Sequence, residues 1–283
     1  MGWQKIDGQL TQLAVGRGNN VWGVNSQDSI FRYINGTWHQ IPGAATYVGV
    51  GADGTVWVVT RAGSIYKWVD YTWIQISGAL AQISVGDATH VWGVTNLTNI
   101  FLRVNGDINT NGLWAQVDGA LSDVSVASDG TVWGVNSNHD IFRWAGYNWE
   151  QVNGKLKQIY VSSRELIVGV NDNNQVFQYV NGTWNQLDGS LSLVYVAISI
   201  DGILWGIDIN NGIHTRQDNL ISQAYSISNS STTPNNAANY SQNNSSIIIG
   251  LALGLGLSII IFITAIVIIV RHYKKAPVLR IAH

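Results

Sequence analysis

Apolar and polar residues alternate in short runs as far as residue 218. The run LSDVSV (121–126) alternates strictly, while TVWGV (131–135) and IFRW (141–144) are short, β-branched and aromatic. Such runs are typical of β-strands. Turns between them are marked by Asp-Gly pairs at 53–54, 129–130 and 201–202 and by Asn-Gly pairs at 35–36 and 181–182. Because no helical periodicity occurs before residue 247, we predict an all-β domain over residues 1–218.

Tryptophan recurs in two parallel series along this domain. The first series has spacings of 35, 35, 41, 35 and 37 residues and consists of Trp22, Trp57, Trp92, Trp133, Val168 and Trp205. The second has spacings of 35, 35, 41, 35 and 35 and consists of Trp3, Trp38, Trp73, Trp114, Trp149 and Trp184. A period of this length indicates units that pack on their neighbours. Four short strands per unit predict a six-bladed β-propeller of four-stranded blades.

The two ends of the domain are expected to meet. The segment WQKIDG (3–8) matches WNQLDG (184–189), which is the last strand of a blade. We therefore expect the N-terminal strand to complete the blade built from residues 191–196, 204–207 and 213–216, which leaves no open edge. The tryptophans, and the glycines that follow most of them, are interpreted mainly as packing residues between blades; these glycines are Gly23, Gly93, Gly134 and Gly206.

Charge changes the picture at the C-terminal end. Residues 247–270 carry no charge, and at about 1.5 Å per residue a helix of this length crosses a bilayer core of about 30 Å. We predict a transmembrane helix there. The preceding 246 residues contain 17 acidic and 11 basic groups, which argues against a nucleic-acid binder. There is no cysteine, so a disulfide framework is excluded.

The repeated unit resembles the tectonin repeat. The resemblance rests on W-x-Q-[IVL]-x-G-x-L-x-x-[IV]-x-V followed by V-W-G-V-N and I-F-R-[YW], as in 114–126 with 132–144. It covers about residues 3–218. The third unit departs by a longer hairpin, VNGDINTNGLW, and the fifth by Val168 in place of Trp. The resemblance implies a tectonin or tachylectin-type propeller; many of these are lectins, and some are intracellular adaptors in membrane trafficking.

Polar, variable loops supply the candidate ligand-binding residues. In a four-stranded meander, the loops between second and third strands and the links between blades share one face, opposite the Asp-Gly and Asn-Gly turns. Asn and Asp side chains suit sugar hydroxyls, and Trp faces suit the apolar side of a sugar ring. The candidates in the loops are Asn25, Asp28, Asn136, Asp140, Asn171, Asn173 and Asp208, and those in the links are Asp118, Asn153 and Asp188. The alternative is that these residues only shape solvated turns.

Catalytic chemistry is not expected. The six histidines are scattered without metal-ligand spacing, and no nucleophile motif or phosphate-binding glycine loop occurs. We therefore expect no enzyme activity, no metal and no cofactor.

Residues 219–246 are rich in Ser, Thr and Asn and are predicted to form a disordered stalk. Glycosylation sequons occur in the stalk at Asn229, Asn239, Asn243 and Asn244, and in the propeller at Asn35, Asn96 and Asn181. The tail, 271–283, begins with the basic run RHYKK, which favours a cytoplasmic C-terminus and an extracellular propeller.

These features lead to two hypotheses for function. The first is a single-pass, membrane-anchored receptor that binds carbohydrate multivalently through its loops. The second is a tail-anchored cytosolic adaptor for proteins or lipids, because the start of the sequence shows no signal-peptide pattern. Small residues at Gly250, Gly254 and Ser258 lie on one face of the predicted span and favour a homodimer.

Overall fold

The computed structural model describes residues 2–104, 113–187 and 189–217. The predicted stalk (219–246), transmembrane helix (247–270) and tail (271–283) lie outside the described residues. So do Asn229, Asn239, Asn243, Asn244, Gly250, Gly254 and Ser258. Within the described part of the chain, no helix is long and apolar enough to cross a membrane.

Six antiparallel four-stranded sheets make up the domain. Blades 1 to 3 consist of β2(Gln12–Val15), β3(Val21–Val24), β4(Ser29–Ile34) and β5(Thr37–Ala44); β6(Tyr47–Val50), β7(Val56–Val59), β8(Ser64–Val69) and β9(Thr72–Ala79); and β10(Gln82–Val85), β11(Val91–Val94), β12(Ile100–Arg103) and β13(Trp114–Val117). Blades 4 and 5 consist of β14(Asp123–Val126), β15(Val132–Val135), β16(Asp140–Trp144) and β17(Trp149–Lys155), and of β18(Gln158–Ser163), β19(Leu166–Val170), β20(Val176–Val180) and β21(Thr183–Gln186). Blade 6 consists of β22(Leu193–Ile198), β23(Ile203–Asp208), β24(Gly212–Gln217) and β1(Gln4–Gln9).

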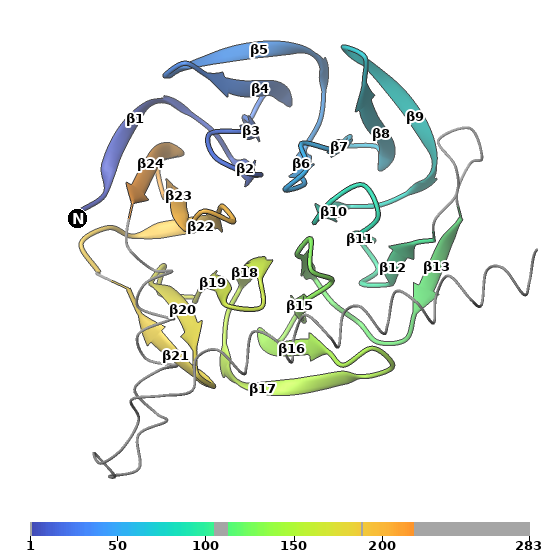
Figure 1. Cartoon of the computed structure of the whole chain (residues 1–283), viewed down its shortest axis with the longest axis vertical. Helices are drawn as coiled ribbons and strands as arrows, with labels where there is room; N and C mark the ends of the chain where they lie inside the picture. The colour runs from blue at the N-terminus through green and yellow to red at the C-terminus, as the bar shows by residue number, and fades with distance from the viewer. Residues whose placement is uncertain (1, 105–112, 188, 218–283) are drawn as a thin grey trace, which may run out of the picture. The chain divides into compact units, whose positions relative to one another are not determined.

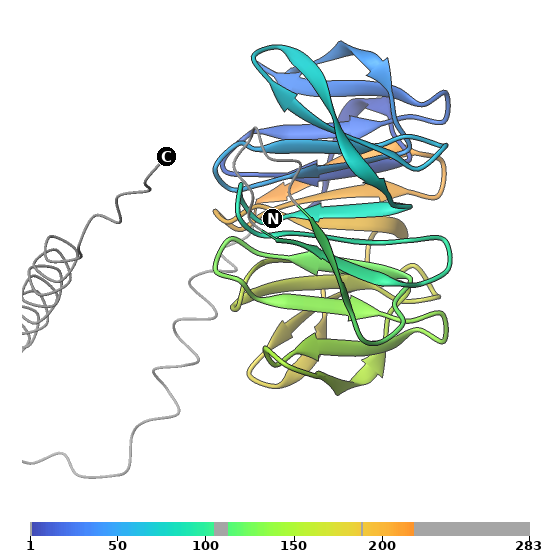
Figure 2. The same cartoon turned by 90° about the vertical axis from the view of Figure 1, so that its right-hand side faces the viewer.

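The blades are arranged as a ring, with the first strand of each nearest the axis (Figure 1). Seen edge-on, the strands run between the two faces of the disc (Figure 2). We call the side that carries the first–second and third–fourth strand hairpins the turn face; it includes Asp53–Gly54 and Asn35–Gly36. The opposite side, the loop face, carries the second–third strand loops and the links between blades. The six-bladed propeller predicted from the repeats is confirmed.

Closure by the N-terminal strand is also confirmed. β1 pairs antiparallel with β24, with Gln4 opposite Thr215 and Ile6 opposite Ile213. The innermost strand of this blade begins at Leu193 rather than at the predicted Leu191. The reason is that the link before this strand is two residues longer than in blade 4, so Leu193, and not Leu191, takes the position against Gly206 that Leu121 takes against Gly134.

The two tryptophan series meet at the junctions between blades. Trp22 of blade 1 lies edge-to-face against Trp73 of blade 2, with ring centroids 6.3 Å apart. The same contact recurs at four more junctions, between Trp57 and Trp114, Trp92 and Trp149, Trp133 and Trp184, and Trp205 and Trp38. In blade 5, Val168 replaces the inner tryptophan and Trp3 packs against its cluster. Each aromatic pair contributes about 0.5–1.5 kcal/mol beyond its buried area, so packing accounts for both series.

The glycine after the inner tryptophan makes room for a leucine. A Cβ added at Gly23 would lie 2.4 Å from Leu10 Cδ1, and one added at Gly134 would lie 2.4 Å from Leu121 Cδ1. The same relationship holds in three other blades, for Gly93 with Leu80, Gly169 with Leu156 and Gly206 with Leu193. These glycines are therefore required for packing, as the sequence pattern indicated.

Candidate functional site

A cleft lies on the loop face where the last blade meets the first, and we call it the seam cleft. Its volume is about 360 Å³, within the range of small-molecule sites. Three segments supply its walls: the end of β1, the β23–β24 loop with the start of β24, and the loop and outer strands of blade 1. The lining residues are Gly8, Gln9, Leu10, Thr11, Asn25, Ser26, Gln27, Phe31, Trp38, Asn211 and Ile213.

The shape of the cleft depends on Gly8. Its φ is +116°, a conformation that side-chain-bearing residues rarely adopt, and a Cβ there would lie 3.1 Å from Trp38 Cδ1. Gly8 therefore lets β1 pass directly over the Trp38 ring. Phe31 and Trp38 are both half-buried, so part of each aromatic side chain is accessible.

Amide and hydroxyl groups supply the polar lining. Asn25 Oδ1 accepts hydrogen bonds from the backbone N–H of Gln27 (3.0 Å) and of Ser29 (2.9 Å), which fixes the loop. The Nδ2 group of Asn25 donates no hydrogen bond to the described residues, whereas that of Asn136 donates to Asp140. Asn25 thus has a rigid position and a spare donor. None of the lining residues is charged, so the cleft suits a neutral polar ligand.

The residues that face each other across the seam on the loop face are short. At the junction of blades 1 and 2, Arg61 donates to Asp28 through two guanidinium nitrogens, at 2.9 and 2.6 Å. At the seam the equivalent loop positions hold Ser26 and Asn211. Asn211 also has the same backbone conformation as Asp28, since their φ angles are 66° and 62°. An ion pair therefore spans the junction of blades 1 and 2, whereas two short side chains face each other across the seam.

A further junction is bridged on the loop face, and one loop is held by a contact within its own blade. His139 Nδ1 lies 2.9 Å from a carboxylate oxygen of Asp172, which links blades 4 and 5. Lys157 donates to the side-chain oxygen of Asn174 in the same blade, beside the junction with blade 6.

Of the loop residues predicted to bind ligand, only one lies in the seam cleft. Asn25 lines the seam cleft, and the other loop candidates lie in loops of blades 1, 4, 5 and 6. Asn136 and Asn171 each accept two backbone hydrogen bonds within their own loops. Asp208 does the same and also binds His214 Nε2 at 2.8 Å. The remaining loop candidates form an ion pair or a turn: Asp28 with Arg61, Asp140 with Lys155, and Asn173 in the Asn171 turn.

The pKa of Asp208 reflects this environment. Burial raises the pKa, but the hydrogen bonds from His214 and the loop backbone outweigh burial and hold it below its ordinary value. Among the link candidates, Asp118 and Asn153 have exposed side chains, and Asp188 lies outside the described residues. The backbone carbonyl of Asp118 accepts from Trp149 Nε1 at 3.0 Å. The structure does not bring the predicted candidates together into one site.

Most residues that line the seam cleft were not among those predicted from the sequence to bind ligand. Trp38 belongs to a tryptophan series that was interpreted as packing, and Phe31 belongs to the repeated strand motif I-F-R-[YW]. Gln9 and Thr11 belong to the link at the start of the chain, whose place beside the last blade depends on ring closure. The available signal was Ser26, a short residue at a loop position where the next blade has Arg61.

The axis of the ring is closed by polar residues from the first strand of every blade. We call these the axial ring: Gln12, Tyr47, Gln82, Asp123, Gln158 and Tyr195. Gln12 exchanges hydrogen bonds with both backbone groups of Val48 in the next blade, each at 2.9 Å. Gln82 and Gln158 bind the next blade in the same way. The cavity lined by Tyr47, Gln82 and Tyr195 of this ring measures about 20 Å³, which is room for about one water.

Asp123 is the carboxylic acid of the axial ring. Its Oδ2 accepts from the backbone N–H of Ile159 at 3.0 Å. Burial raises the pKa of Asp123 to about 7, because a buried carboxylate loses its hydration; the hydrogen bonds from Ile159 and Tyr47 only partly oppose this. The Tyr47 and Tyr195 hydroxyl oxygens lie 3.0 Å apart, and burial with the nearby Asp123 charge raises the pKa of both phenols.

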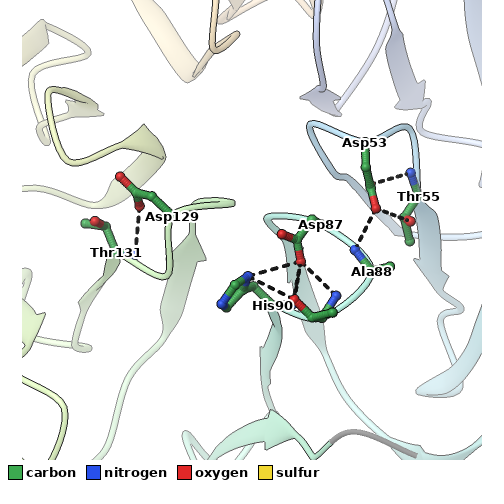
Figure 3. Close-up of polar contacts among 8 residues, drawn as sticks. Asp53, Thr55, Asp87, Ala88, His90, Asp129 and Thr131 are labelled. Atoms are coloured by element: carbon green, nitrogen blue, oxygen red, sulfur yellow. Dashed lines mark hydrogen bonds and ion pairs between the residues drawn. The ribbon is translucent and has the colours of Figure 1, made fainter. Parts of the chain in front are cut away.

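The Asp-Gly turns hold neighbouring blades together on the turn face (Figure 3). Asp53 binds its own turn through Thr55 N and accepts from Ala88 N of the next blade at 2.9 Å. Equivalent contacts join Asp129 to Arg164 N at 2.9 Å and Asp201 to Gly18 N at 2.6 Å. Burial raises the pKa of Asp129, but these hydrogen bonds outweigh burial and lower it overall. The recurring aspartates therefore act as clamps between turns.

Comparison with known families and structures agrees with this fold. A model of the tectonin domain matches residues 9–208 and 167–228. No curated protein sequence matches the chain.

Similar solved structures include that of U3-55K, with a TM-score of 0.56, 12% identity, and coverage of 76% of this chain and 80% of that chain. A streptogramin B lyase structure has a TM-score of 0.51 and 17% identity, with coverage of 69% and 74%. YCF48 bound to D1 peptide has a TM-score of 0.50 and 14% identity, with coverage of 77% and 81%. At these identities the likeness concerns the fold alone.

Proposed function

Because the chain belongs to the tectonin family, whose propellers are typically binding domains, we propose that it is a membrane-anchored, lectin-like receptor that binds carbohydrate in the seam cleft. The observation that carries this proposal is the lining of the cleft, which combines two aromatic side chains with amides and hydroxyls and has no charged group.

This lining matches the chemistry of a neutral sugar. Sugar hydroxyls both donate and accept hydrogen bonds, and Asn25, Gln27 and Asn211 offer amide groups of both kinds. The accessible parts of Phe31 and Trp38 suit the C–H face of a sugar ring. An acidic sugar would find no cation among the lining residues, so neutral glycans are expected to bind in preference.

The test is a glycan array containing neutral and acidic sugars, probed with the full chain in detergent, followed by titration of each hit. The matched variant closes the cleft: Ser26→Arg with Asn211→Asp places at the seam the same pair that bridges blades 1 and 2. We expect this double variant to lose glycan binding while its melting temperature stays near that of the wild type.

The control places the same pair elsewhere on the loop face. Ser137→Arg with Thr98→Asp occupies the equivalent positions between blades 3 and 4 and should leave binding intact. No binding to any glycan by folded protein would contradict the lectin proposal. Binding that is equally strong in both double variants would instead show that the sugar binds outside the seam.

We also propose that residues 247–270 anchor the protein with the propeller outside the cell and the basic tail in the cytoplasm. The support is the uncharged run followed by RHYKK. Asn35, Asn96 and Asn181 are exposed in the described part of the chain, and the further sequons precede the span. Expression in a eukaryotic cell followed by deglycosylation should reduce the mass. An unchanged mass would favour the cytosolic adaptor hypothesis.

A homodimer through the span would make binding multivalent. Gly250, Gly254 and Ser258 are spaced for close helix packing, and two linked sites can raise avidity by about 10²–10⁴ without any new contact. Cross-linking of the full chain in membranes should trap a dimer, and Gly254→Ile should reduce it. Cross-linking that is unchanged by this substitution would contradict the proposed face.

A further inference from the structure

Three successive blades expose a large apolar side chain at their outermost hairpin on the turn face. Tyr71 of blade 2 is 89% exposed, Leu113 of blade 3 is 75% exposed and Tyr147 of blade 4 is 83% exposed. Each lies in the connection between the third and fourth strands of its blade. We call these three residues the apolar arc. Blades 1 and 5 instead have the polar pairs Asn35–Gly36 and Asn181–Gly182 there.

Tyr71 has a backbone conformation that bulky residues rarely adopt. Its φ is +63°, and Asp70 before it has a φ of +47°. The equivalent positions in blades 1 and 5 are Gly36 and Gly182, with φ of +88° and +84°. A bulky residue in this region costs roughly 1–2 kcal/mol, since its Cβ approaches the backbone. Because most of the Tyr71 side chain is exposed, packing does not offset this strain, which points to a role for the side chain outside the fold.

The chain leaves the propeller on this same face. Gln217, at the end of β24, pairs with Ile203, which follows the Asp201–Gly202 turn of the turn face. In the sequence, the 24-residue uncharged run 247–270 begins 30 residues after Gln217. A flexible chain of 30 residues spans on the order of 30 Å, so the proposed anchor is connected to the turn face by a short length of chain.

We infer that the apolar arc contacts the headgroup region of the membrane that anchors the chain, so that the turn face rests on the lipid and the seam cleft faces away from it. This inference rests on the proposed anchoring. Tyrosine suits the membrane–water interface because its ring is apolar and its hydroxyl is polar. The three side chains stand on separate hairpins with polar neighbours such as Asp70 and Asn148, which suits shallow insertion of individual side chains.

The test uses the absence of cysteine from the chain. Single cysteines at Tyr71→Cys and Tyr147→Cys are labelled with an environment-sensitive fluorophore in the full chain, reconstituted into phosphatidylcholine vesicles with or without nitroxide-labelled lipid. The matched controls are Ala62→Cys and Ser137→Cys, exposed positions on the loop face of the same two blades. We expect blue-shifted emission and nitroxide quenching at 71 and 147 and neither change at 62 and 137.

The outcomes separate this inference from the anchoring on which it rests. Vesicle flotation of the labelled proteins reports anchoring independently of fluorescence. Protein that floats, but whose labels at 71 and 147 behave like those at 62 and 137, overturns the lipid contact and leaves anchoring in place. Protein that fails to float overturns both. Energy transfer between labels at 71 on different molecules, without nitroxide quenching, would assign the arc to a second copy and overturn the lipid contact.

Discussion

Ala45 and Val58 occupy, in blade 2, the positions that a leucine and a glycine occupy in the other five blades. Both side chains are buried in the same hydrophobic cluster. Elsewhere the glycine is required because a Cβ would collide with the leucine, as at Gly93 and Leu80, where the separation would be 2.5 Å. In blade 2 the larger of the two side chains is therefore Val58 on the second strand, whereas in the other blades it is the leucine at or just before the start of the first strand.

The exchange predicts a strong coupling between these two positions. Ala45→Leu alone should overpack the cluster and cost about 1–3 kcal/mol of the free energy of unfolding. Val58→Gly alone should cost about 2–3 kcal/mol, because a buried valine is lost. The double variant restores the arrangement of the other blades, so its cost should be smaller than the sum by about 0.5–3 kcal/mol. Denaturant unfolding of the four proteins checks this, and additive costs would contradict it.

Asp123 predicts a pH dependence of stability. Its pKa is raised from 3.8 to about 7 in the folded state, so between these values the folded protein holds a proton that the unfolded protein releases. This contribution is fully present below pH 3.8 and is lost as the pH rises to about 7. At most it amounts to a few kcal/mol, since one pKa unit corresponds to about 1.4 kcal/mol.

The measurement compares the wild type with Asp123→Asn from pH 4 to 8. The amide can still accept from Ile159 N but does not titrate, so the free energy of unfolding should fall with pH less steeply in the variant. Asp118→Asn, which makes the same substitution at an exposed position, is the control. Parallel curves for the wild type and Asp123→Asn would refute the prediction.

Gln158 should matter more for stability than its polar side chain suggests. It is buried and satisfies both backbone groups of Val196, with its Nε2 3.0 Å from the carbonyl and its Oε1 3.1 Å from the nitrogen. Gln158→Met keeps the volume but leaves a buried N–H and C=O without partners, at about 1–3 kcal/mol each. Thermal unfolding should show a lower melting temperature, while the exposed Gln151→Met should have little effect. Equal melting temperatures would contradict the role of the axial ring.

Removing the N-terminal strand should destabilise the whole ring. Deletion of residues 1–7 removes the pairing of Gln4 and Ile6 with β24 and exposes an unpaired edge. We expect a lower melting temperature and a tendency to associate at higher concentration. Lys5→Ala, which keeps the backbone pairing, is the control. An unchanged melting temperature for the deletion would show that β1 is dispensable for closure.

The fold followed from sequence because each blade repeats its local signals. The two tryptophan series marked equivalent strands, and the Asp-Gly and Asn-Gly pairs marked the turns. The candidate site could not be predicted in the same way, because the seam cleft is lined by the end of β1, the start of β24 and the loop of blade 1, which come together only when the ring closes. Asp123 was hidden for a similar reason, since a polar residue in an alternating strand looks solvent-facing unless that strand is known to line the axis.

The clamps between blades alternate around the ring, and this limits how such a ring can change size. Glutamines of the axial ring join blades 1 to 2, 3 to 4 and 5 to 6, whereas turn-face aspartates join 2 to 3, 4 to 5 and 6 to 1. The repeating unit at this level is a pair of blades with approximate threefold symmetry. Insertion or loss of a single blade would place two blades of the same type next to each other. The junction between them would then lack either the glutamine contact or the aspartate contact that it needs. Duplication or deletion of blades is therefore expected to succeed in pairs.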